Sequence, residues 1–331
     1  MSLEQPNSYN KLPAGHEAVI QYRPKFIARG GDHLVYETEG HPDTVIKAST
    51  FKLKDILMDN AERGQPLDDI SDEMRSALEQ ELEEKNAQIR LYREYFGAKH
   101  TLSERRYLMQ VPISPEIIEE IYKKDWTYRV PPQGIENIQS AWTAAVIQKK
   151  APQISDPNHL QFSFGGFVEE RTVKPDSNEY AKLNDAFLGK ETITPEDLEL
   201  FFKIQDNPEI HALSDLLAKA EAEPALKEAI KDFIGKSIIF ANETGNILAL
   251  AGEDNVILYP QDDTWSFLLV DAIPLYNQPL YQEAKEILIR ERKGEVLNKE
   301  ETGFLTRGYN FVRTMNGLAA ALGMTERLQL P

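Results

Sequence analysis

Short apolar runs alternate with turn-forming residues near the start of the chain. The runs lie at 25–28, 33–38 and 44–48, and they are separated by a glycine pair at 30–31 and by the Gly-His-Pro-Asp segment at 40–43. Apolar runs of this length, bounded by glycine and proline, are typical of β-strands joined by tight turns. The pattern therefore predicts three consecutive strands in a meander.

The spacing of the apolar residues changes after Ser71. They now recur at helical intervals and Gly97 follows the last of them. The positions are Met74, Leu78, Leu82, Ile89, Tyr92 and Phe96. This spacing predicts one long amphipathic helix from about Ser71 to Phe96. The weaker pattern at 51–69 predicts a loop with one short helix.

Later segments predict a mixture of helices and strands. A Ser114-Pro115 start predicts a short helix at 117–122, because serine caps helices and proline fits their first turn. The aromatic, glycine-rich stretch at 162–167 is typical of a loop or lid. Further strands are predicted at 106–111, 141–147, 237–240, 246–250, 256–259 and 265–270, and further helices at 194–204, 210–221, 224–234 and from Gln278 onward.

Composition and charge narrow the classes of partner. The chain has 331 residues, which corresponds to about two packing units. Its 37 basic and 54 acidic residues give 37 − 54 = −17, and the basic residues form no cluster. A negative net charge repels phosphate backbones and anionic lipid, so we expect neither a nucleic-acid nor a membrane partner. A free nucleotide bound with a metal ion remains compatible with this charge.

The absence of cysteine excludes disulfides, thiolate nucleophiles and cysteine-ligated metals. The first residues lack the features of a signal peptide, and no apolar run is long enough to span a bilayer, so we expect a cytoplasmic protein. The six histidines lack the spacing of zinc ligands.

Two local motifs resemble the protein-kinase superfamily. The segment 27–36 contains Gly30 and Gly31 and looks like the kinase phosphate loop, in which glycines let backbone N–H groups approach phosphate. The tripeptide Val45-Ile46-Lys47 is similar to the strand whose lysine contacts the α- and β-phosphates of the nucleotide. The order of strands, one long helix, strands and helices also resembles that fold.

The resemblance implies further site residues. A helix carboxylate, Glu81 or Glu84, would pair with Lys47. Asn246 and Asp271 would bind Mg²⁺, since Gly245-Asn246-Ile247-Leu248 looks like the end of the kinase catalytic loop and Leu268 to Asp271 like the strand before the metal-binding aspartate. Asn255 is the alternative to Asn246. We prefer Asn246 because the predicted strand at 237–240 would then precede the loop.

The sequence departs from the family at the catalytic base. The position five residues before the asparagine is Ala241, or Leu250 in the alternative alignment, and neither accepts a proton. Glu243 lies in the same segment and is the candidate substitute. Asp271 is followed by Ala-Ile-Pro, so the activation switch of regulated protein kinases is not evident.

The resemblance therefore implies an α+β, bilobal, protein-kinase-like fold. A leader at 1–20 would precede an antiparallel-sheet N-lobe with one long helix at 21–150 and a mainly helical C-lobe at 151–331. The implied function is ATP and Mg²⁺ binding with phosphoryl or nucleotidyl transfer. One alternative is a pseudokinase that presents this fold to a protein partner, and another is an unrelated α+β protein.

Overall fold

A computed structural model describes most of the chain, and it divides into two compact units. Unit 1 comprises residues 1–94 and 102–151, and unit 2 comprises residues 95–101 and 152–331. The described residues are 23–29, 33–102, 104–123, 130–150, 159–162, 193–204, 208–248, 255–270, 274–276 and 278–329.

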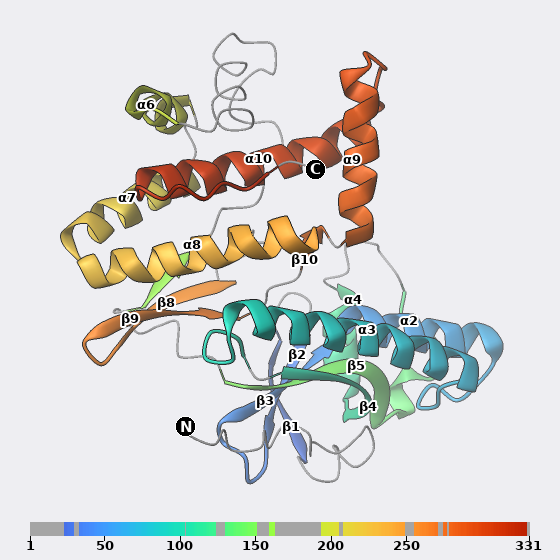
Figure 1. Cartoon of the computed structure of the whole chain (residues 1–331). Helices are drawn as coiled ribbons and strands as arrows, with labels where there is room; N and C mark the ends of the chain where they lie inside the picture. The colour runs from blue at the N-terminus through green and yellow to red at the C-terminus, as the bar shows by residue number, and fades with distance from the viewer. Residues whose placement is uncertain are drawn as a thin grey trace. The chain divides into compact units, whose positions relative to one another are not determined.

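Unit 1 is built on an antiparallel sheet of five strands (Figure 1). The strands are β1 (Pro24–Arg29), β2 (His33–Thr38), β3 (Thr44–Ser49), β4 (Glu104–Pro112) and β5 (Ser140–Lys149). Their order is β1-β2-β3-β5-β4, which makes β3 the central strand. The meander and the two later strands predicted in this region are confirmed.

The helices of unit 1 are α2 (Thr50–Arg63), α3 (Asp72–Phe96), the 3₁₀ turn η2 (Ile135–Asn137) and α4 (Pro115–Lys123). The long helix and the short helix after Ser114 are confirmed, and the backbone N–H of Ile117 donates to the Ser114 hydroxyl. The expectation of only a short helix within 51–69 is wrong, because α2 has 14 residues. It is stabilised by a Ser49 cap and by burial of Leu53, Ile56 and Leu57, which share one face.

The sheet buries a different apolar cluster on each face. One cluster contains Ile46 and Ala48 of β3 together with side chains of α4. The other contains Leu78 and Leu82 of α3, and Trp142 packs against it. Because side chains alternate along a strand, β4 and β5 supply residues to both clusters. The face that carries the second cluster is called the α3 face below.

The outer edge of the sheet is covered at β4. Asn86 of α3 donates through its amide nitrogen to the Arg106 carbonyl (3.0 Å), and the Arg106 N–H donates to the Asn86 amide oxygen (2.9 Å). Asn86 is buried. One side chain therefore satisfies both outward backbone groups of Arg106.

Unit 2 is mainly helical. Its helices are α6 (Pro195–Ile204), α7 (Pro208–Ala222), α8 (Pro224–Thr244), α9 (Gln278–Arg292) and α10 (Lys299–Ala321). Its strands are β6 (Leu160–Phe162), β7 (Ile247–Leu248), β8 (Val256–Gln261), β9 (Thr264–Leu269) and β10 (Pro274–Tyr276). They form a β6-β8-β9 sheet and a β10-β7 pair, so the chain is an α+β protein.

The strand predicted at 237–240 is wrong, because these residues continue α8. The two isoleucines suggested a strand, but the buried residues of α8 recur at intervals of three and four: Leu226, Ala229, Ile230, Phe233, Ile234, Ser237, Ile238, Phe240 and Ala241. Packing of this face overrides local propensity. The helix ends at Gly245, whose φ of 70° suits glycine.

Candidate functional site

Lys47 lies at the centre of the unit 1 sheet. On β3 it pairs with Val35 of β2 and with Val146 of β5. Its neighbours Ile46 and Ala48 belong to the opposite cluster, so the Lys47 side chain projects from the α3 face. It is half-buried, and none of the described carboxylates forms an ion pair with it.

The two glutamates proposed for Lys47 differ in environment. Glu84 is exposed and accepts a hydrogen bond from Gln80. Glu81 is half-buried and pairs with Lys52 of α2 (2.6 Å) and with Lys85 (2.6 Å). Burial acts to raise the pKa of Glu81, but the hydrogen bonds from the two lysines outweigh it and the pKa is lowered. Glu81 is thus a fixed anion on α3 whose partners are Lys52 and Lys85.

A hollow of about 350 Å³ is lined by residues of α2 and α3. It is lined by Lys52, Asp55, Ile56, Arg63, Glu73, Met74, Ala77 and Leu78. Lys47 is not among these residues. Charged residues that line the hollow already form ion pairs, as Arg63 does with Asp59 and Glu73. This hollow therefore does not mark the predicted phosphate site.

Asn246 and Asn255 occupy different positions in unit 2. Asn246 directly follows the helix-ending Gly245, and its N–H donates to the Thr244 hydroxyl (3.1 Å). Asn255 stands at the start of the β8–β9 hairpin, where its carbonyl accepts from the Val270 N–H (2.9 Å). Asn255 is therefore hydrogen-bonded to the residue that precedes Asp271. Gly30, Gly31 and Asp271 lie outside the described residues.

Glu243, the candidate base, lies in the last turn of α8. It is exposed, and its carboxylate accepts a hydrogen bond from the Tyr95 hydroxyl (2.9 Å). Ala241 is buried within the same helix and not in a loop. Glu243 thus has a structural partner in unit 2.

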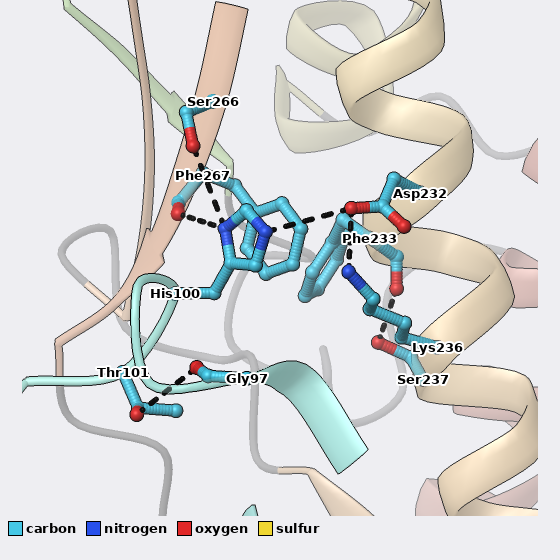
Figure 2. Close-up of polar contacts among 9 residues, drawn as sticks. All are labelled: Gly97, His100, Thr101, Asp232, Phe233, Lys236, Ser237, Ser266 and Phe267. Atoms are coloured by element: carbon cyan, nitrogen blue, oxygen red, sulfur yellow. Dashed lines mark hydrogen bonds and ion pairs between the residues drawn. The ribbon is translucent and has the colours of Figure 1, made fainter. Parts of the chain in front are cut away.

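Sequence reasoning missed a buried histidine cluster in unit 2 (Figure 2). His100 is 2% exposed and stacks on Phe267, with 3.9 Å between ring centroids. Its Nδ1 lies 2.8 Å from the Phe267 carbonyl oxygen, and because a carbonyl only accepts, Nδ1 carries the proton. Nε2 faces Asp232 Oδ2 at 3.6 Å, and Lys236 also pairs with Asp232 (2.6 Å).

Backbone bonds fix the segment that carries His100. The Leu269 N–H donates to the His100 carbonyl (2.8 Å), and Thr101 forms a bridge with Leu269. The only local signal in the sequence is a histidine shortly after a helix-ending glycine. Its partners are far along the chain, and no spacing rule finds them.

Burial lowers the pKa of His100, and the Phe267 carbonyl opposes this effect. Lys236 and Lys99 lower the pKa further, while Asp232 raises it, and the net shift is downward. Below pH about 6.5, a histidine with a lowered folded-state pKa binds fewer protons in the folded chain than the same histidine binds in the unfolded chain. Its contribution to stability is therefore present above pH about 6.5 and is lost as the pH falls toward the folded-state pKa.

We expect acidification from neutral pH to lower the free energy of unfolding more steeply in the parent chain than in His100→Asn. The asparagine amide replaces the Nδ1 donor but does not titrate. Urea denaturation at a series of pH values measures the difference. His41→Asn, in a surface turn of unit 1, is the matched control, and equal slopes for the parent chain and His100→Asn would contradict the assignment.

No family model matches this chain, and neither the curated proteins nor the solved structures include a match to it. Among the described residues, no helix has both the length and the apolar character needed to cross a membrane.

Proposed function

We propose that this chain is a kinase-like, ATP-binding protein, with Lys47 contacting the phosphates and Asn255 and Asp271 binding Mg²⁺. Gly30 and Gly31 would cover the phosphates. The reaction class is transfer of a phosphoryl or nucleotidyl group. The observation that carries the proposal is Lys47 itself, a half-buried lysine on the central strand that none of the described acids neutralises.

The position of Lys47 is difficult to explain by stability alone. A lysine side chain flanked by valines on both neighbouring strands loses hydration, and a structural lysine in such a place normally has an acidic partner. The acid close to this face, Glu81, is paired with Lys52 and Lys85 instead. An anionic ligand would provide the counter-charge that none of the described acids supplies to Lys47.

Asn255 is now the preferred amide. Asn246 was preferred on a predicted strand at 237–240, and that segment is helical. Asn255 directly precedes a β-hairpin, and its backbone bonds the residue before Asp271. Asp271 directly follows Val270 in the sequence, which supports a cation shared by the Asn255 amide and the Asp271 carboxylate.

The chemistry of these two side chains suits Mg²⁺, which prefers oxygen ligands. The described residues contain no group of three His, Cys, Asp or Glu side chains that could hold a metal. Phosphate oxygens and water would therefore complete the coordination, as is usual for Mg²⁺ with nucleotides. When bound, the ion would neutralise charge on the phosphates.

We expect ATP with Mg²⁺ to raise the melting temperature of the parent chain and Lys47→Ala to weaken ATP binding roughly 10- to 150-fold, the effect of a charged hydrogen bond. Isothermal titration calorimetry measures the affinity. Lys25→Ala is the matched control, because Lys25 lies on the same sheet but is exposed and pairs with Glu37. Equal ATP affinity in Lys47→Ala and the parent chain would refute the proposal.

The choice of asparagine is tested separately. Asn255→Ala should reduce the Mg²⁺ dependence of ATP binding, whereas Asn246→Ala should leave it unchanged. The reverse result would assign Mg²⁺ binding to Asn246 and would leave the proposed nucleotide site around Lys47 unchanged.

A second candidate function is nucleotide binding without turnover, in a pseudokinase that presents a surface to a protein partner. It is favoured by the helical, buried position of Ala241 and by the bond that already engages Glu243 with Tyr95. Incubation with γ-labelled and α-labelled ATP distinguishes the two functions. Label transfer that Glu243→Gln abolishes supports the enzyme, and binding without transfer supports the pseudokinase.

A further inference from the structure

The segment after α10 lies in an extended conformation between two helices of unit 2. The chain leaves α10 through Gly323, whose φ of 73° permits the turn. Met324 then packs over Gly235 of α8, where an added Cβ would lie 3.4 Å from the methionine methyl group. Figure 1 draws α8 and α10 alongside each other, and the two helices are in contact.

Two asparagine side chains hold the backbone of this segment. Asn316 of α10 donates to the Leu328 carbonyl (3.0 Å) and accepts from the Leu328 N–H (2.8 Å). Asn242 of α8 donates to the Arg327 carbonyl (2.9 Å) and accepts from the Gln329 N–H (3.0 Å). Each amide thus makes a two-point contact of the kind one strand makes with another.

The two asparagines contact opposite edges of the segment. In an extended chain the N–H and C=O of one residue point to the same edge, and those of its neighbours point to the other. Asn316 binds both groups of Leu328, whereas Asn242 binds the groups on either side of it. All four hydrogen bonds therefore bind backbone groups of the segment, and every peptide has such groups.

Only one side chain of the segment is fully buried. Leu328 is 3% exposed, whereas Thr325, Glu326 and Gln329 are exposed. Arg327 is half-buried, and its guanidinium bonds the Met324 and Glu326 carbonyls within the segment itself. The side-chain contact of this segment is thus concentrated on one buried leucine.

We propose that the surfaces of α8 and α10 that contact residues 324–329 form a peptide-binding site, and that this segment is its ligand in cis. The ligand class is an extended peptide that is bound through its backbone and through one leucine-like side chain. The short connection through Gly323 gives the segment a local concentration on the order of millimolar, so it occupies the site whenever it is attached. Severing that connection makes the occupant exchangeable. The proposal is independent of nucleotide binding.

The test uses the full chain with a protease site inserted between Gly323 and Met324, cut after folding. A fluorescent peptide with the sequence of residues 324–331 is added in excess. We expect it to displace the severed segment and bind saturably, which fluorescence anisotropy measures. The uncut chain should bind it at least roughly 100-fold more weakly, because the attached segment competes.

Matched peptides and variants report which contacts matter. A Leu328→Asp peptide should not bind, and a Glu326→Ala peptide should bind like the parent peptide. Asn316→Ala or Asn242→Ala in the cut chain should weaken binding roughly 5- to 150-fold, since each leaves two backbone groups without partners. Asn137→Ala, an exposed residue of unit 1, is the control.

Three results would overturn the proposal. The first is that the severed segment fails to exchange, which would make it an integral part of the core. The second is that the Leu328→Asp peptide binds as well as the parent peptide. The third is that cutting unfolds unit 2 and excess peptide does not restore its cooperative thermal transition. Restoration of that transition by the peptide supports the proposal as directly as exchange does.

Discussion

Phe267→Ala is expected to lower the free energy of unfolding by roughly 3–5 kcal/mol, the usual cost of truncating a fully buried phenylalanine. Phe267 has no exposed surface, and among the described residues its ring lies near four side chains of unit 2. Its ring stacks on His100 at 3.9 Å, makes an edge contact with Phe233 at 5.3 Å and lies near Phe96 and Lys236. These neighbours come from two segments far apart in the sequence, 96–100 and 233–236 of α8, so the cavity cannot collapse easily.

Urea denaturation measures this effect, and an unchanged m-value licenses the comparison. Ile239→Ala is the control. Ile239 is 45% exposed on α8, and a surface truncation there should change stability by no more than about 0.5 kcal/mol. A loss below about 1.5 kcal/mol for Phe267→Ala would show that the site repacks. A double-mutant cycle with His100→Ala isolates the ring stacking, which we expect to contribute about 0.5–1.5 kcal/mol.

In unit 1, we expect Tyr36→Ala to cost roughly 3–5 kcal/mol and Tyr36→Phe only about 1–2 kcal/mol. Tyr36 is fully buried in the first apolar cluster, touches Phe26 edge-on, and donates its hydroxyl to the Pro112 carbonyl (2.9 Å). Burial raises the pKa of Tyr36 far above its usual value, so the phenol stays neutral. The pair of variants therefore separates ring packing from the hydrogen bond.

Chemical denaturation of both variants checks this prediction. The difference between Tyr36→Phe and the parent chain should not vary between pH 6 and pH 9, because the phenol does not ionise in this range. Equal losses for the two variants would mean that the hydroxyl, rather than the ring, dominates this position.

The periodicity of the sequence predicted the elements whose burial is simple. Strand β2 buries every second residue and the helix 72–96 buries residues at helical intervals, so the pattern alone located both. The strand prediction for residues 237–240 was wrong because β-branched side chains favour strands locally. The burial of these residues instead continues the helical spacing that begins some ten positions earlier. Local preference and tertiary packing disagree there.

The candidate site was predictable only in part. Lys47 was selected because glycines and an apolar strand surround it in the sequence, and the structure confirms the strand. The pairing of Glu81 with Lys52 was not, since an acidic helix offers many equivalent carboxylates and only the position of α2 selects one. His100, Asn242 and Asn316 depend on partners 12 to 167 residues away.

The pair of hydrogen bonds between the Asn86 side chain and the Arg106 backbone on β4 has a consequence for assembly. A free sheet edge is a template on which a strand from another molecule can form, and this is a common start of aggregation. At Arg106 the outward N–H and C=O are already satisfied by Asn86, so an incoming strand would find no partner there. An intermolecular sheet could grow past this position only after the two Asn86 hydrogen bonds had broken. Concentrated solutions of the chain are thereby protected from aggregation at the β4 edge.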